Sequence, residues 1–216
     1  VLPNGITEIG TYAMYYLDRL DSIQWGGTVQ IIRDYAFYGC SGLLSLSFPL
    51  SLTNVYQYSF SNCSNLRTLN TGDGLQQIGY RSFESCGNLR SVHTGESLTS
   101  IDSYAFRYCS KIQHIDFGNS PVSVGSRAFY SSPSLKSLRG SRIKSIGDYA
   151  FYDCDSLVNL QFGDSLRYIR NQAFYGCHSL RGLHLPSTLT SMSGDCFVYA
   201  YVLDTIIVDP ANTTIA

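Results

Sequence analysis

The sequence predicts a repeat solenoid of the α/β type, mostly β, with one parallel β-sheet and about nine units of 23 residues. Three observations predict this fold. An aromatic residue returns at an almost constant step, apolar residues keep fixed distances from it, and each unit has one short strand pattern. Periods of about 20 to 50 residues are typical of stacked repeats, whose units bury their apolar sides against their neighbours.

The first column of the repeat is aromatic. Its members lie 23 residues apart, with one step of 22 between Phe129 and Phe151, and Met14 lies 23 residues before Phe37. The column consists of Phe37, Phe60, Phe83, Phe106, Phe129, Phe151, Phe174 and Phe197. Such regularity predicts one buried row of stacked side chains.

Aliphatic residues occupy three further columns. Five residues before the aromatic stand Ile9, Ile32, Val55, Ile78, Ile101, Val124, Ile146, Ile169 and Met192. Six after it stand Leu20, Leu43, Leu66, Leu89, Ile112, Leu135, Leu157, Leu180 and Leu203. Nine after it stand Ile23, Leu46, Leu69, Val92, Ile115, Leu138, Leu160, Leu183 and Ile206. No unit has enough apolar surface to fold alone, whereas stacked columns form one core.

Each unit has one segment with the two-residue alternation of a β-strand, centred nine residues after the aromatic. One strand per unit predicts a parallel sheet with strands about 4.8 Å apart and a rod roughly 45 Å long. A Gly or Pro twelve after the aromatic ends most strands, as at Pro49, Gly72, Gly95, Gly118, Gly163 and Pro186. The I-G-x-x-A-F stretch predicts a short strand or turn that leads into a 3₁₀ or single-turn helix.

The consensus L-x-x-L-x-[FL]-P-x-x-L-x-x-I-G-x-x-A-F-x-x-C resembles the BspA-type (Treponema pallidum type) leucine-rich repeat over essentially the whole chain. IGDYAFYDC at 146–154 and LPSTLTSM at 185–192 carry the resemblance best. It implies a right-handed leucine-rich-repeat superhelix with the parallel sheet on the concave side and short strands or 3₁₀ turns on the convex side. It also implies a group of bacterial and protozoan surface proteins, many linked to adhesion.

Residues 1–216 are predicted to form a single solenoid, and because VLPNGITEIG already matches the repeat interior we expect a fragment of a longer protein. Fifteen basic against sixteen acidic side chains leave a net charge of −1, which gives no argument for nucleic acid. No apolar run has the length of a membrane span. Neither a P-loop, a dinucleotide fingerprint nor a Ser-His-Asp order occurs, so we predict no enzymatic activity and no cofactor.

Six of the seven cysteines lie three residues after the aromatic, namely Cys40, Cys63, Cys86, Cys109, Cys154 and Cys177. Other units have Leu17, Ser132 or Ala200 at this position, which favours a small or apolar side chain over a covalent bond. The spacing of zinc-binding cysteine pairs is absent. We predict buried free thiols, Cys196 included, with a disulfide or a metal site as the alternatives.

Polar, varied residues occupy the outward positions of the predicted sheet, eight and ten after each aromatic. These columns suit either a ligand-binding surface or a plain solvated face. From them the predicted ligand-binding residues are Asn70, His93, His114, Asp116, Arg139, Gln161 and His184. His93, His114 and Asp116 are expected on adjacent strands, where two imidazoles and a carboxylate are suitable ligands for a transition metal. The favoured interpretation has no metal there and pairs Arg139 with Asp116.

Ten of the 17 tyrosines fall in two columns beside the aromatic, two before it and one after it. The structural interpretation is that their rings stack along the solenoid. The functional one is an exposed tyrosine face suited to binding proteins or glycans.

The sequence thus favours a non-enzymatic, secreted or cell-surface binding module, monomeric, that recognises a protein or a glycan such as host matrix or another cell surface. It has no nucleic-acid partner and no membrane insertion in this segment. The alternative is a structural spacer in a larger surface protein, without a ligand of its own.

Overall fold

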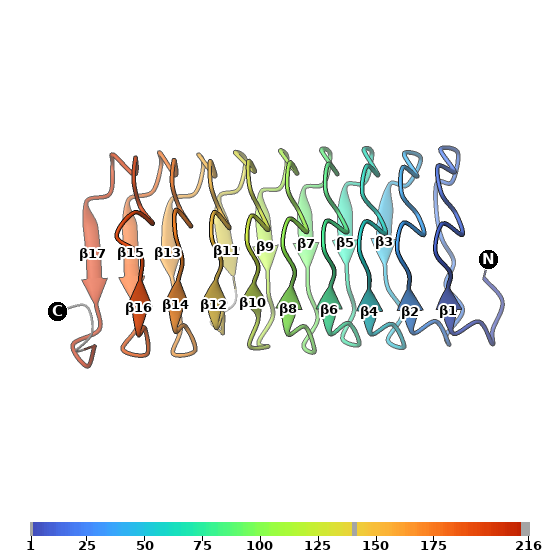
Figure 1. The fold of residues 1–216 in the computed structure, drawn as a ribbon, viewed down its shortest axis with the longest axis horizontal. Helices are drawn as coiled ribbons and strands as arrows, with labels where there is room; N and C mark the ends of the chain where they lie inside the picture. The colour runs from blue at the N-terminus through green and yellow to red at the C-terminus, as the bar shows by residue number, and fades with distance from the viewer. Residues whose placement is uncertain (1, 140–141, 213–216) are drawn as a thin grey trace.

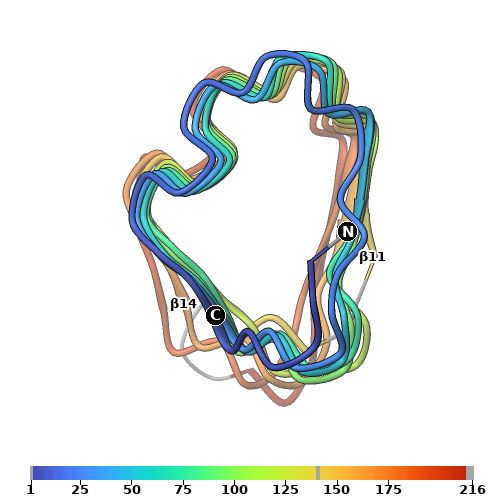
Figure 2. The ribbon, with the colours of Figure 1, turned by 90° about the vertical axis from the view of Figure 1, so that its right-hand side faces the viewer.

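The computed structural model describes residues 2–139 and 142–212 and shows a straight rod of stacked turns (Figure 1). Seen along the rod, the turns nearly overlap and close around one interior (Figure 2). The described residues contain nine two-residue strands on one side and eight longer strands on the other. They contain no helix, and so none with the length and hydropathy to cross a membrane.

The short strands form a single nine-stranded parallel sheet that runs the length of the rod. Each strand ends at the aliphatic column five residues before the aromatic, and its pairing partner lies one unit away, as Ile32 lies opposite Val55. In order, the strands are β1 (Glu8–Ile9), β2 (Ile31–Ile32), β4 (Asn54–Val55), β6 (Gln77–Ile78), β8 (Ser100–Ile101), β10 (Ser123–Val124), β12 (Ser145–Ile146), β14 (Tyr168–Ile169) and β16 (Ser191–Met192). The repeat thus stacks at the predicted step.

The long strands lie at the predicted L-x-x-L-x-L positions, but the described residues form two parallel sheets there and not one. The first contains β3 (Ser45–Ser47), β5 (Thr68–Asn70), β7 (Ser91–His93), β9 (His114–Asp116) and β11 (Ser137–Arg139). The second contains β13 (Asn159–Gln161), β15 (Gly182–Leu185) and β17 (Thr205–Val208).

The break between these sheets falls in the unit with the 22-residue step. Five residues, 140–144, connect β11 to β12, whereas six, 117–122, connect β9 to β10. The short-strand sheet keeps its register here, with Ser123 opposite Ser145. The missing residue is therefore accommodated on the long-strand side, where β11 and β13 do not pair.

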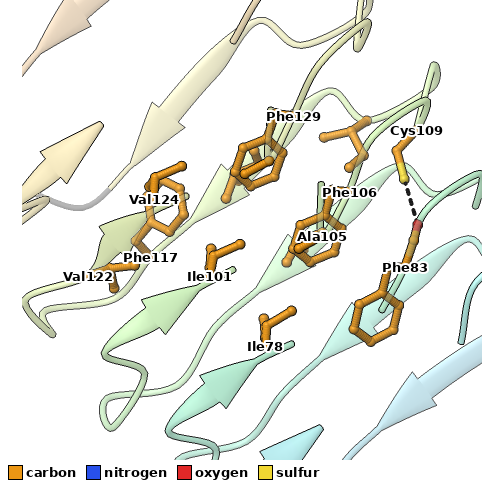
Figure 3. Close-up of a cluster of buried hydrophobic side chains, with 14 of the residues drawn as sticks. Ile78, Phe83, Ile101, Ala105, Phe106, Cys109, Phe117, Val122, Val124 and Phe129 are labelled. Carbon is orange, nitrogen blue, oxygen red and sulfur yellow. Dashed lines mark hydrogen bonds between the residues drawn. The ribbon is translucent and has the colours of Figure 1, made fainter. Parts of the chain in front are cut away.

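The predicted aromatic row forms the centre of the core. Phe83, Phe106 and Phe129 are fully buried, and adjacent rings stack with centroids 5.1 to 5.2 Å apart and planes within 3 to 7° of parallel (Figure 3). The aliphatic columns flank this row, as Ile78 and Ile101 do in Figure 3. Because each ring contacts the ring above and the ring below, one continuous apolar column stabilises the whole rod.

The stretch around the aromatic forms turns, and the predicted 3₁₀ or single-turn helix is wrong. Residues two before and two after the aromatic adopt left-handed backbone angles, for example Tyr35 with φ 56° and Gly39 with φ 71°. The N–H groups of Tyr35, Phe37 and Gly39 donate to carbonyls of the next unit at 2.7 to 3.1 Å. A helix would direct these N–H groups into its own chain, whereas the left-handed residues turn every second one towards the neighbouring unit.

All seven cysteines are free and buried, as predicted. The thiols of Cys63, Cys86 and Cys109 each donate a hydrogen bond at 3.2 to 3.3 Å to a Phe carbonyl of the preceding unit. Burial raises the pKa of the Cys177 and Cys196 thiols to about 12. These thiols are therefore neutral donors that link units, which favours Cys over Ala at this position.

Candidate ligand-binding surface

The long-strand face consists of the outward side chains of the eight long strands, and it holds all seven predicted ligand-binding residues. In the first sheet the register places Asn70 opposite His93, His93 opposite Asp116, and Asp116 opposite Arg139. These four residues form one row across β5, β7, β9 and β11. His114 lies on the same face of β9, in the parallel row of residues eight after each aromatic.

The second sheet carries the two remaining predicted residues. Gln161 of β13 lies opposite His184 of β15, and the next member of their row is Ile207 of β17. The structure therefore separates the seven residues into a group of five on the first sheet and a pair on the second, because β11 and β13 do not pair.

The polar cluster on the first sheet is bound to its own chain. The Asp116 carboxylate accepts a hydrogen bond at 3.1 Å from the N–H of Gly118, two residues later, and His114 Nδ1 lies 2.9 Å from the Ser137 hydroxyl. A carboxylate that caps its own turn in this way is common at a strand end. The predicted Asp116–Arg139 ion pair is wrong, since no ion pair joins them in the described structure.

The metal hypothesis for His93, His114 and Asp116 finds no support. Within residues 2–139 and 142–212, no group of three or more His, Cys, Asp and Glu side chains is arranged to hold a metal ion. The His114 ring is held by Ser137 on one side and the Asp116 carboxylate by a backbone N–H, so these groups do not converge on a common point.

A groove of about 440 Å³ lies over the second sheet, and both predicted residues of that sheet line it. Its floor is Gly182, where an added Cβ would lie 2.7 Å from the Asn159 side-chain oxygen. The missing side chain lowers the surface between Gln161 and His184. His184 Nδ1 is buried without a hydrogen-bond partner in the described structure, so the groove offers one unused polar atom.

Ile207 is the member of the groove that sequence reasoning missed. It lies ten residues after Phe197, in the outward row whose other members are polar, and 54% of its surface is exposed. Arg181 and Asp204 line the groove beside it. The signal was present in the sequence as an aliphatic residue in an outward column. The groove combines apolar, charged and hydrogen-bonding groups, the mixture that small ligand sites use.

The tyrosine columns stack along the rod, as one interpretation predicted. The rings of Tyr35 and Tyr58 lie 4.7 Å apart with planes 7° from parallel, and Tyr152 and Tyr175 are arranged in the same way. Where a column has arginine, the guanidinium replaces a ring, as Arg81 does at 4.8 Å from the Tyr104 centroid. The columns thus have a structural role on the side of the turns.

Comparison with known proteins gives a consistent result. The BspA type Leucine rich repeat region family matches residues 1–113 and 99–216, with six copies of the repeat. Among solved structures, the Leucine Rich Repeat protein of T. pallidum is similar with a TM-score of 0.64 and 29% identity, over 71% of this chain and 72% of that chain.

Two further structures cover more of the chain at lower similarity. A leucine rich cell surface protein from Faecalibacterium prausnitzii has a TM-score of 0.45 and 19% identity, over 97% of this chain and 78% of that chain. The pneumococcal vaccine antigen PcpA has a TM-score of 0.46 and 14% identity, over 96% and 75%. A search of curated protein sequences finds no significant match. Because the repeat model covers both halves of the chain, this protein belongs to the BspA-type leucine-rich repeat family.

Proposed function

We propose that this chain is a non-enzymatic binding module, acting at a cell surface or after secretion, that recognises a protein or a glycan through the long-strand face. The groove over β13, β15 and β17 is its main contact and the row on the first sheet a secondary one. The observation that supports this is the groove itself, where Gly182, the unpartnered His184 Nδ1 and the exposed Ile207 meet.

The physical argument rests on rigidity and on the free state of the groove. The long strands are fixed by ladders on both sides and by the aromatic core beneath, so a ligand binds a surface that needs little ordering. An exposed isoleucine and a buried, unpaired ring nitrogen both gain when a ligand covers them, by apolar burial and by a hydrogen bond. The first sheet's polar groups are already paired within the chain, so they gain less.

The test is binding of the folded chain to a panel of immobilised matrix proteins and a glycan array. Gly182→Arg fills the groove at small cost to the fold, because only the flexible Asn159 side chain must move. We expect at least a tenfold loss of affinity with Gly182→Arg and with Ile207→Asp. The matched control is Ser47→Arg, an outward position in the same row on β3.

A second arm replaces His93, His114, Asp116 and Arg139 together with alanine. Under our proposal this variant loses less affinity than Gly182→Arg. Equal binding by wild type and Gly182→Arg would refute the groove as the main contact. If the wild-type chain retained no panel protein or glycan, the result would favour a spacer without a ligand of its own.

A further inference from the structure

A second hollow lies on the opposite side of the rod, over the short-strand sheet, and it is basic. It has a volume of about 600 Å³ and lies over β10, β12 and β14. The residues that give it its character are Arg142, Lys144, Arg167, Asp164, Ser165 and Tyr168. Three cations and one carboxylate in one hollow contrast with the net charge of −1 for the whole chain.

The three cations are local exceptions to the repeat. Seven residues before the aromatic, the units have Thr7, Gln30, Thr53, Gln76, Thr99, Val122, Lys144, Arg167 and Thr190. Cations thus occur only in two consecutive units. Nine residues before the aromatic every unit has Gly, Ser or Thr except the one with Arg142, which is also the unit with the shorter connection.

The backbone holds these cations side by side. The N–H of Arg167 donates to the Lys144 carbonyl at 2.9 Å, and the N–H of Val122 donates to the Arg142 carbonyl at 3.1 Å. All three side chains are exposed, and none forms an ion pair with a described residue. Like charges held together without counter-charges produce a local positive potential that attracts an anion.

The remaining groups of the hollow indicate which anion fits. Tyr168 presents a ring that is 42% exposed, and the Arg170 guanidinium lies 5.2 Å from its centroid. A flat aromatic face packs well against the C–H face of a sugar ring. Asp164 accepts hydrogen bonds from sugar hydroxyls, whereas it would repel a phosphate or an acidic peptide, and Ser165 adds a further hydroxyl.

We infer that this hollow, the basic hollow, is a binding site for an anionic saccharide, whose sulfate or carboxylate groups contact Arg142, Lys144 and Arg167 while a sugar ring lies on Tyr168. Its volume lies within the range of about 300 to 1,000 Å³ that small ligand sites occupy. The site is separate from the groove and does not depend on the function proposed for the long-strand face.

The experiment measures binding of three hexasaccharides by isothermal titration calorimetry at two salt concentrations. A heparin-derived hexasaccharide carries sulfate and carboxylate, a hexagalacturonate carries carboxylate alone, and chitohexaose is neutral. We expect the first or the second to bind, with affinity that falls as salt rises, and chitohexaose to bind at least tenfold more weakly. Which anion binds more tightly distinguishes a sulfated from a uronate ligand.

The test variants use residues that the repeat already accepts. Lys144→Gln with Arg167→Thr introduces residues found in the same column, and we expect at least a tenfold loss of affinity and a smaller salt dependence. Tyr168→Ser, the residue of neighbouring units, should weaken binding three- to tenfold and leave the salt dependence unchanged. The charge-matched control is Arg90→Gln with Lys136→Gln, two cations seven residues after their aromatics, where Gln113 occurs in the unit between.

Three results would overturn the inference. They are no binding of either anionic hexasaccharide, an equal loss with the control pair, and an unaffected Tyr168→Ser variant together with equal binding of a DNA oligonucleotide. Gly182→Arg should leave hexasaccharide binding unchanged, which separates this site from the groove.

Discussion

The aromatic row inside the rod and the outward row of the long strands come from the same repeat, but they differ in how strictly they repeat. Phe occupies eight of nine places in the inner row, and every ring contacts its neighbours at nearly one distance. The outward row changes residue at almost every unit, from Asn70 to His93 to Asp116. The inner row therefore determines stability, and the outward row is free to determine what is bound.

The largest expected effect is in the inner row. Phe106→Ala removes a fully buried ring that stacks on Phe83 and Phe129, and we expect a loss of about 3 to 5 kcal/mol in the free energy of unfolding. Phe197→Ala should cost clearly less, because Phe197 is only partly buried and stacks on one described ring, Phe174. Denaturant unfolding followed by circular dichroism measures both. Equal costs would show that stacking on two sides contributes nothing.

The next effect concerns the cysteine column and pH. Burial raises the pKa of Cys177 from 9.0 to about 12, so the folded chain holds this proton more tightly than the unfolded chain. The resulting stabilisation is complete below pH 9 and is lost as pH rises from 9 towards 12. From pH 8 to 10.5 we expect Cys177→Ala to lose about 2 kcal/mol less stability than the wild type.

This comparison with Cys177→Ala isolates the thiol, because the tyrosines whose pKa burial also raises, such as Tyr130, are present in both proteins. Alanine is acceptable at this position, since Ala200 occupies it in the last unit. Parallel pH curves for the two proteins would mean that the Cys177 thiol does not titrate differently in the folded state.

A smaller effect tests the left-handed turns that separate the inner row from the surface. Ser85 has φ 61°, two residues after Phe83, where Gly39 and Gly176 stand in other units. A β-branched residue is poorly accommodated there, so we expect Ser85→Val to destabilise by about 1 to 2 kcal/mol. Ser85→Gly is the matched control and should change stability by less than about 1 kcal/mol. The reverse order would contradict the observed backbone angle.

Sequence reasoning predicted the stacked units, the buried columns, the free thiols and the placement of the outward residues, because each depends only on the constant step. It failed where one unit departs from that step or where backbone angles decide. The split of the long-strand sheet follows from one missing residue before β12, and the turns follow from left-handed angles at residues such as Tyr35 that do not favour them.

The candidate site was predictable in position but not in shape. The column rule placed Gln161 and His184 on one face, yet the groove depends on Gly182 lacking a side chain and on Ile207 facing outwards. The Asp116–Arg139 pair failed for a local reason, since a carboxylate finds the N–H of Gly118 two residues away before it reaches a flexible arginine. Sequence columns give neighbours, whereas side-chain conformations decide which neighbours bond.

The smallest expected effect is on the outward row. His93 is exposed and lies between Asn70 and Asp116, and no printed contact of its ring stabilises the sheet, so we expect His93→Ser to change the free energy of unfolding by less than about 0.5 kcal/mol. The measurement is the same denaturant unfolding used for Phe106→Ala, with Val92→Ala as the matched control one residue earlier and facing the core. Val92 is fully buried, and its truncation should cost about 2 kcal/mol or more. A cost for His93→Ser that approaches that of Val92→Ala would mean that the outward row also carries stability. The contrast between a row that holds the rod together and a row that is free to change would then fail.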